Sequence, residues 1–341
     1  MTGRRAGLRL AAVVGVTTAV VLGTGLAGCG NAGGTGDDGV RVVATTTMLG
    51  DVLGDLVACA GGRTTTLMPI GADPHDFAPS SADITAMVRA DLVVANGLGL
   101  EEGLGDAIAN AAKDGARVLE VAPELDPIPF AAAGHDPDEA DHEADHEADH
   151  EATGEADQHD HADGTMDPHV WHDVARMATT ARLVATELGK ITHDTETFDR
   201  CGAQVAGELD GVDAKIREIL RVVPAERRIL ITDHHAFGYF AEAYDFTVAG
   251  VVVPGGSTLA APSSADLAEL VEVIRAAAVP VIFSNTALSA DLIDTVAAEV
   301  GTEATVVSLF VGSLGARDSG AETYAAMVQT NAQRIAEALT R

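Results

Sequence analysis

The residues best able to do chemistry are histidines that come just after apolar segments. His75 lies in PIGADPHDFAPSS, His169 in MDPHVWHDV, and His234 and His235 in LITDHHAFGYF. Neutral imidazole is a good ligand for zinc and for other metals of intermediate softness. Ligands of α/β lobes bind at the carboxyl ends of strands, so histidines from these three loops could converge at a cleft. A single surface histidine more often has no such role, but the repeated position after strands favours a metal site.

A second group of histidines lies in an acidic insert at residues 131–164. DHEA occurs there three times in tandem, and no lysine or arginine appears between residues 118 and 175. So polar a segment cannot bury a hydrophobic core, and we expect it to be disordered without metal. Its candidate auxiliary metal ligands are His142, His146, His150, His159 and His161. Pairs of them could bind zinc weakly and concentrate it near a main site. The alternative is a solvated linker whose metal binding is incidental.

The rest of the chain must supply the elements that position these loops. Short apolar runs alternate with helical periodicity, as in β-α units with parallel sheets. Expected strands cover 40–46, 64–70, 91–97, 116–122, 227–233, 246–252, 279–285 and 304–310. Expected helices cover 48–57, 80–90, 172–191, 195–223, 264–278, 289–301 and 322–339. This order predicts an α/β protein with two lobes, each a roughly four-stranded, mainly parallel sheet flanked by helices.

The N-terminal residues indicate export. Three arginines within the first nine residues precede an apolar run that ends in LAGC. Small residues directly before Cys29 resemble a bacterial lipobox. We therefore expect a lipoprotein signal peptide at 1–28, and a lipidated Cys29 with a flexible tether at 29–39. The protein would be anchored at the outer face of the cytoplasmic membrane or lie in the periplasm. An uncleaved membrane anchor, or a plain signal peptide with an incidental cysteine, is the alternative.

The remaining chain is expected to divide as follows: an N-terminal lobe at 40–130, the insert at 131–164, the completion of that lobe with long linking helices at 165–223, and a C-terminal lobe at 224–341. A formal net charge of −31 repels nucleic acid and attracts cations. In an oxidising compartment, Cys59 and Cys201 could form a disulfide or remain two separate buried thiols.

Four ordered blocks resemble the substrate-binding lipoproteins of zinc and manganese ABC importers. They are GADPHDFAPSSAD, DPHVWHD, DHHAFGYFAEAYDF, and SLFVGSLG with SGAETYAAMVQTNAQRI, and the resemblance extends from about residue 40 to 340. It implies two α/β lobes joined by one long rigid helix, with a metal held between them by His75, His169 and His234. His234 is favoured over His235 because it matches the family pattern T-x-H-x-A-F. The family also implies a permease partner, and we expect a monomer.

Two departures from the family bear on the choice of metal. Relatives often carry a glutamate where this chain has Asn285, and many carry an aspartate where it has Gly312. Hard Mn²⁺ prefers carboxylate oxygen, whereas three imidazoles suit Zn²⁺ better. We therefore predict Zn²⁺ as the transported ion and Mn²⁺ as the alternative. His172, His235 and Asn285 are expected behind the ligands, while Trp171 and Asp173 are expected to pack and cap the following helix.

Two alternative functions from other classes are a zinc hydrolase and a surface adhesin. Three histidines with an open position also describe a catalytic zinc. However, the sequence contains no H-E-x-x-H motif and no nucleophile motif. We therefore predict a binding protein and not an enzyme. An adhesin would bind its protein partner with or without zinc.

Overall fold

Two four-stranded parallel sheets form the framework of the protein. The structure, a computed structural model, describes residues 39–130, 166–253, 255–260, 262–276, 281–285, 296–301 and 305–341. The first sheet has the order β2-β1-β3-β4, with β1 (Arg41–Ala44), β2 (Arg63–Thr66), β3 (Leu92–Ala95) and β4 (Val118–Glu120). The second has the order β6-β5-β7-β8, with β5 (Ile229–Thr232), β6 (Thr247–Val251), β7 (Val281–Asn285) and β8 (Thr305–Leu309). Every pairing within them is parallel, which confirms the predicted fold class.

The helices occupy the intervals between strands. They are α1 (Thr47–Cys59), α2 (Ser81–Arg89), α3 (Gly105–Lys113), α4 (Val174–Thr192), α5 (Thr195–Leu220), α6 (Gly238–Tyr244), α7 (Ser264–Ala276) and α9 (Tyr324–Leu339). Short 3-10 turns are η1 (Ala122–Glu124), η4 (Val170–His172) and η5 (Ala225–Arg227). Helices α3 and α6 were missed by the sequence prediction. Both are short, and neither begins with a side-chain cap. Most of the helix expected at 289–301 lies outside the described residues.

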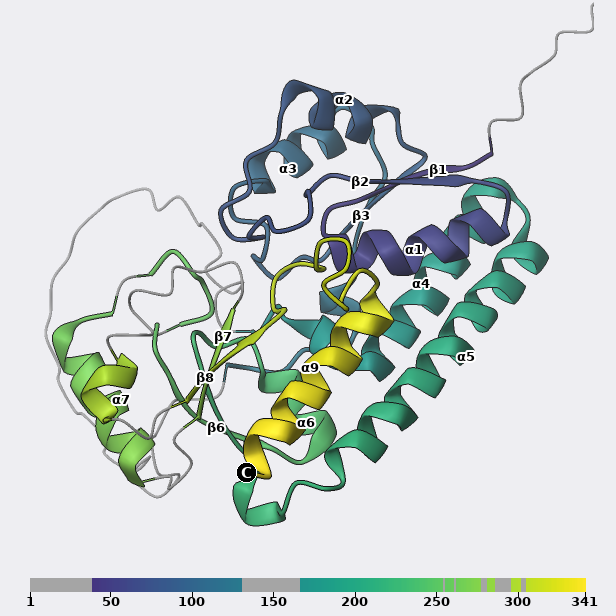
Figure 1. The fold of residues 1–341 in the computed structure, drawn as a ribbon. Coiled ribbons are helices and arrows are strands. Elements are labelled where there is room, and N and C mark those ends of the chain that lie inside the picture. Colours follow the sequence, from purple (N-terminus) through teal and green to yellow (C-terminus); the bar gives the residue numbers. More distant parts are fainter. Residues whose placement is uncertain are drawn as a thin grey trace, which may run out of the picture. The chain divides into compact units, whose positions relative to one another are not determined.

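The central strands of each sheet are buried on both faces, and the two faces pack against different partners. In β1, Val42 and Ala44 belong to the main core, whereas Val43 faces a separate cluster with Met87 of α2 and Ile108 of α3. This alternation follows from the two-residue period of a strand. Figure 1 shows α2 and α3 on one side of the first sheet and α1 on the other. Parallel strands covered on both sides read as continuous apolar runs, as β3 does here with the sequence LVVA.

The second sheet follows the same plan. Leu230 and Phe283 belong to the main core, while Ile231 and Ile282 face a cluster with Leu270 and its neighbours on α7. The main core also contains buried residues of α1, α4, α5 and α9. One hydrophobic core is therefore shared by the inner faces of both sheets.

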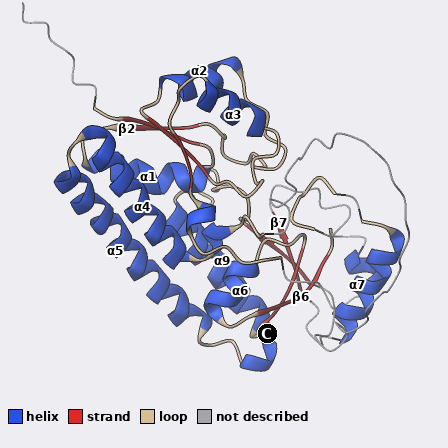
Figure 2. Ribbon diagram, turned by 180° about the vertical axis from the view of Figure 1, so that it is seen from behind, coloured by secondary structure: helices blue, strands red, loops and turns tan. Residues whose placement is uncertain are grey.

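The two long helices form the connection between the sheets. Helices α4 and α5 pack closely against each other, and α5 also contacts α1 and α9 (Figure 2). His193 ends α4 in the left-handed conformation, with φ of 59°, and Asp194 caps α5 by accepting the Thr197 amide. The long bridging helix implied by the resemblance is thus α5, which leads from α4 to β5.

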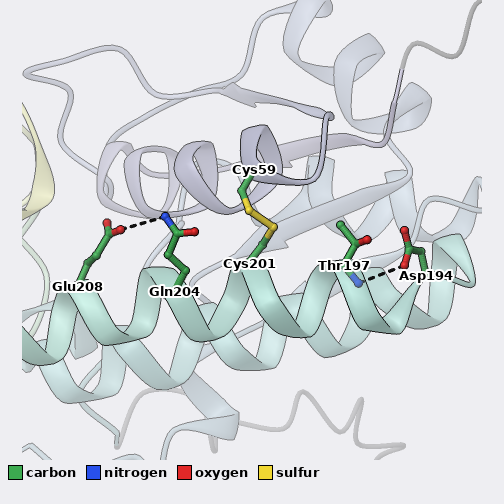
Figure 3. Close-up of a disulfide and its surroundings, with 6 residues drawn as sticks. All are labelled: Cys59, Asp194, Thr197, Cys201, Gln204 and Glu208. Carbon is green, nitrogen blue, oxygen red and sulfur yellow. Dashed lines mark hydrogen bonds between the residues drawn. A yellow bond between two sulfur atoms is a disulfide. The ribbon is translucent and has the colours of Figure 1, made fainter.

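A disulfide joins α1 to this helical pair. Cys59, the last residue of α1, is bonded to Cys201 of α5, with 5.8 Å between their Cα atoms. Figure 3 shows the bridge beside the Asp194 cap and the Gln204–Glu208 hydrogen bond. Within the described residues, no helix combines the length and apolar character needed to cross a bilayer.

Candidate metal-binding site

Three loops at the carboxyl ends of strands carry the predicted histidines. His75 lies in the segment between β2 and α2, His169 directly precedes η4, and His234 lies two residues after β5. The first two occur in the same tripeptide, Asp-Pro-His, and adopt the same turn. The Asp73 carboxylate accepts the His75 amide at 3.0 Å, and that of Asp167 accepts the His169 amide at 2.9 Å. The repeated tripeptide therefore fixes the backbone position from which each of these two imidazoles extends.

The structure brings the three imidazoles together. One ring nitrogen from each of His75, His169 and His234 lies within 4.8 Å of the others, and the residues are 3%, 1% and 1% exposed. Their ring centroids lie 5.2–5.9 Å apart. Within the described residues, no carboxylate belongs to this group. The geometry suits a cation that is bound mainly by imidazole nitrogen.

A carboxylate lies behind each ring. The Nδ1 atom is 3.3 Å from Glu102 in His75, 2.8 Å from Asp167 in His169, and 3.2 Å from Asp233 in His234. Partners of this kind fix ring orientation and make the imidazole a stronger ligand. In His169, whose Nδ1 is hydrogen-bonded to Asp167, this arrangement leaves Nε2 to bind a metal ion. In His169 this Nε2 is buried and has no hydrogen-bond partner among the described residues.

Sequence reasoning did not find these three carboxylates. A usable signal was present for two of them, because Asp167 and Asp233 precede their histidines by two and one positions. Glu102 gave no signal, since it is 27 positions from His75 and reaches it only through the fold.

The two sides of the site are linked by hydrogen bonds. Asp73 also accepts the Thr258 hydroxyl at 2.6 Å, and the Gly71 amide donates to the Ser313 hydroxyl at 2.8 Å. Asp73 and Gly71 belong to the loop of His75, whereas Thr258 and Ser313 follow strands of the second sheet. The loop of His75, which follows a strand of the first sheet, is therefore also hydrogen-bonded to two loops of the second sheet.

Burial and charge set different proton affinities for the three imidazoles. Burial, aided by the neighbouring imidazoles, lowers the pKa of His75 and lowers that of His169 well below its usual range. Burial also acts to lower the pKa of His234, but Asp233, with smaller contributions from Asp73 and Asp167, outweighs it and raises this pKa above its ordinary value of 6.5. Burial raises the pKa of Asp167 to about 7.

Metal affinity should fall as the pH decreases through neutrality. A cation displaces the proton of His234 and favours ionised Asp167, whose pKa values are both raised. The pKa values of His75 and His169 are lowered, so these two rings contribute less to the proton release. We expect about one to two protons to be released per ion near pH 6–7. Calorimetry in buffers of different ionisation enthalpy measures this number, and an affinity that stays constant from about pH 8 to 6 would contradict the assignment.

The structure describes both positions that bear on the choice of metal, Asn285 and Gly312. Asn285 ends β7 and is buried. Gly312 contacts the loop of His75 closely, because a Cβ placed on it would lie only 2.8 Å from Cδ of Pro74. A side chain at position 312 would therefore lie beside the loop of His75, where this chain offers none.

The other residues of the histidine segments have packing roles. His172 is buried and stacks on Phe237 with 4.5 Å between centroids, outside the imidazole cluster. His235 lies against Phe130 at 6.2 Å. The Trp171 indole donates to a backbone carbonyl at 2.8 Å, and Asp173 caps α4 by accepting the Ala175 amide.

A cavity of about 260 Å³ opens beside the site. Its lining includes His75, Glu102, Phe130 and Gly256. Phe130 is the last described residue before the acidic insert, and an isolated bridge pairs Pro129 with Met166 on the other side of it. Both ends of the insert therefore lie together near this opening. Cys29 and the five auxiliary histidines fall outside the described residues.

Comparison with known proteins agrees with this architecture. Residues 42–338 match the family model described as ZnuA, zinc-uptake complex component A, periplasmic. The chain is 30% identical over 310 residues to the zinc-binding protein TroA of Treponema pallidum, covering 89% of this chain and 90% of that protein. It is 26% identical over 321 residues to the manganese-binding lipoprotein MntA of Halalkalibacterium halodurans, covering 92% and 94%.

The solved structures give the same result. The periplasmic zinc-binding protein TroA of Treponema pallidum superposes with a TM-score of 0.72 and 27% identity, covering 89% of this chain and all of that one. These relatives are named as metal-binding proteins and not as enzymes, in agreement with the sequence-based prediction. The resemblance drawn from the four sequence blocks is confirmed: the chain belongs to the family of the zinc-uptake complex component A.

Proposed function

We propose that this protein captures Zn²⁺ outside the cytoplasm with His75, His169 and His234 and delivers it to the permease of an ABC importer. The observation that carries the proposal is the convergence of three buried imidazoles whose ligand atoms lie within 4.8 Å of one another. The family description, a component of a zinc-uptake complex, supports a membrane partner. Lipidation of Cys29 would keep the protein beside that partner.

The donor set favours zinc over manganese. Relatives are named for both metals, so family membership alone does not choose between them. Manganese prefers oxygen ligands, but Gly312 offers no side chain and Asn285 offers at most a neutral amide. Three imidazoles with one position left for water match the preference of zinc for nitrogen and for four ligands.

The acidic insert would collect zinc for this site. Its two ends meet near the cavity beside His75, so weakly bound ions on its histidines would be released close to the opening. Tethering weak ligands near a tight site raises the local concentration of the ion.

A competition titration with Zn²⁺ and Mn²⁺ tests the proposed metal. The full chain should bind one zinc ion tightly, at least about a hundredfold more tightly than manganese, because nitrogen donors discriminate in this direction. A variant that lacks residues 131–164 serves as the control and should keep this site while losing weaker ones. Equal or tighter manganese binding would contradict the choice of zinc, and loss of tight binding with the insert would contradict the ligand assignment.

A further inference from the structure

Asp233 is a buried carboxylate with almost no hydrogen-bonding surroundings. It is fully buried, and neither carboxylate oxygen has a hydrogen-bond partner among the described residues. Nδ1 of His234 lies 3.2 Å from Oδ2 of Asp233. The backbone holds it rigidly, since its amide donates to the Phe283 carbonyl and its carbonyl accepts the Val253 amide at 2.7 Å. Such a carboxylate is costly unless a positive charge lies nearby.

The other two carboxylates behind the rings are satisfied in other ways. The Asp167 carboxylate accepts hydrogen bonds from the backbone amide of His169 and from its ring atom Nδ1. The Glu102 side chain is 42% exposed, so water solvates and screens its charge. Asp233 alone among the three has neither an amide donor nor solvent. Its field is therefore the least screened and acts most strongly on the imidazole cluster.

Within the part of the chain that the structure describes, the proposed site offers no negatively charged ligand. The described residues place three neutral donors around the site and no carboxylate among them. A dication held only by imidazole would leave two buried positive charges, which the surroundings must compensate.

We propose that Asp233 supplies this counter-charge from behind His234, and that its negative charge raises the affinity of the site for a dication. This inference rests on the proposed function, because it assumes that His234 binds the ion. Asp233 is thus a positioning and charge-compensating residue that does not itself coordinate. It also explains why a costly buried carboxylate is kept at a site without acidic ligands.

The substitutions Asp233→Asn and Asp233→Ala separate charge from orientation. Asparagine keeps a side chain of the same shape beside Nδ1 of His234 but carries no charge, whereas alanine removes both the side chain and the charge. We expect both variants, as full chains, to bind Zn²⁺ about 10–100-fold more weakly. The metal-free Asp233→Asn variant should melt at the same or a higher temperature, because an unsolvated carboxylate has been removed. Weaker binding without lower stability is the signature of a charge role.

Asp51→Asn is the matched control. Asp51 is a partly buried carboxylate on α1 that accepts the Tyr324 amide and lies outside the imidazole cluster. Its replacement should leave zinc affinity unchanged. The visible absorption spectrum of bound Co²⁺ should be the same in the Asp233→Asn variant as in the unmodified chain, since the three ligands remain.

Each contrary outcome overturns the inference. Unchanged affinity in Asp233→Asn with loss in Asp233→Ala would assign Asp233 to orientation only. A parallel loss of affinity and metal-free melting temperature would make it merely structural. A changed Co²⁺ spectrum would make it a direct ligand. If the unmodified chain binds no zinc, or binds it without His169, the proposed function fails first, and that result is distinguishable from failure confined to the Asp233 variants.

Discussion

Replacing His169 with alanine should lower the zinc affinity by about two to three orders of magnitude. His169 is almost fully buried, and its ring is fixed by the 2.8 Å contact with Asp167, so its unpartnered Nε2 is already directed for binding. Structural zinc sites bind with roughly 10–16 kcal/mol over about four ligands, which makes each ligand worth about 3–4 kcal/mol. Every 1.4 kcal/mol is about tenfold in affinity. Competition with a chromophoric chelator measures the loss.

His172→Phe is the control for this variant. It keeps a ring stacked on Phe237 and removes a histidine only three positions from His169. It should bind zinc as tightly as the unmodified chain, because His172 lies outside the cluster. The melting temperature of each metal-free variant shows that the fold is retained. Tight zinc binding that survives His169→Ala would mean that the site lies elsewhere in the chain.

Of the changes proposed here, loss of the disulfide should cause the largest decrease in the free energy of unfolding. Cys59 and Cys201 are 142 positions apart, so the bridge closes a long loop and restricts the unfolded chain strongly. The chain-entropy model gives about 5 kcal/mol for such a loop. For a protein of this size, we expect the melting temperature to fall by on the order of 10 °C in Cys59→Ala/Cys201→Ala. Thermal or urea unfolding under non-reducing conditions measures the difference.

Reduction of the unmodified chain provides the matched comparison. It should reproduce the lower melting temperature of the double variant, which itself should not respond to reductant. Zinc affinity should change little, because the disulfide is at the opposite end of α1 from the site. The end of α1 near the site is Thr47, which contacts Ser313. Equal stability of the oxidised and reduced chains would show that the shared core alone holds α1 against α5.

The order of strands and helices could be predicted because apolar runs and helical spacing are visible within short stretches of sequence. Apolar runs such as 91–97 and 279–285 gave the strands, and three- and four-residue spacing gave α4, α5 and α9. Helices α3 and α6 were missed because both are short and neither begins with a capping side chain that would mark its start in the sequence. The strand predicted at 64–70 ends at Thr66, before a segment that contains Pro69 and Gly71, which favour turns.

The sequence by itself determined which kinds of side chain could bind a metal and at which strand ends they lie. His75, His169 and His234 were identifiable because their chemistry and their motifs are local properties. Only the tertiary structure decided which carboxylates stand behind them, that Cys59 meets Cys201, and that both sheets share one core. The reason is physical. Glu102 and His75 come into contact only after distant segments pack, and so do the two cysteines. The local sequence between such residues does not indicate that they will meet.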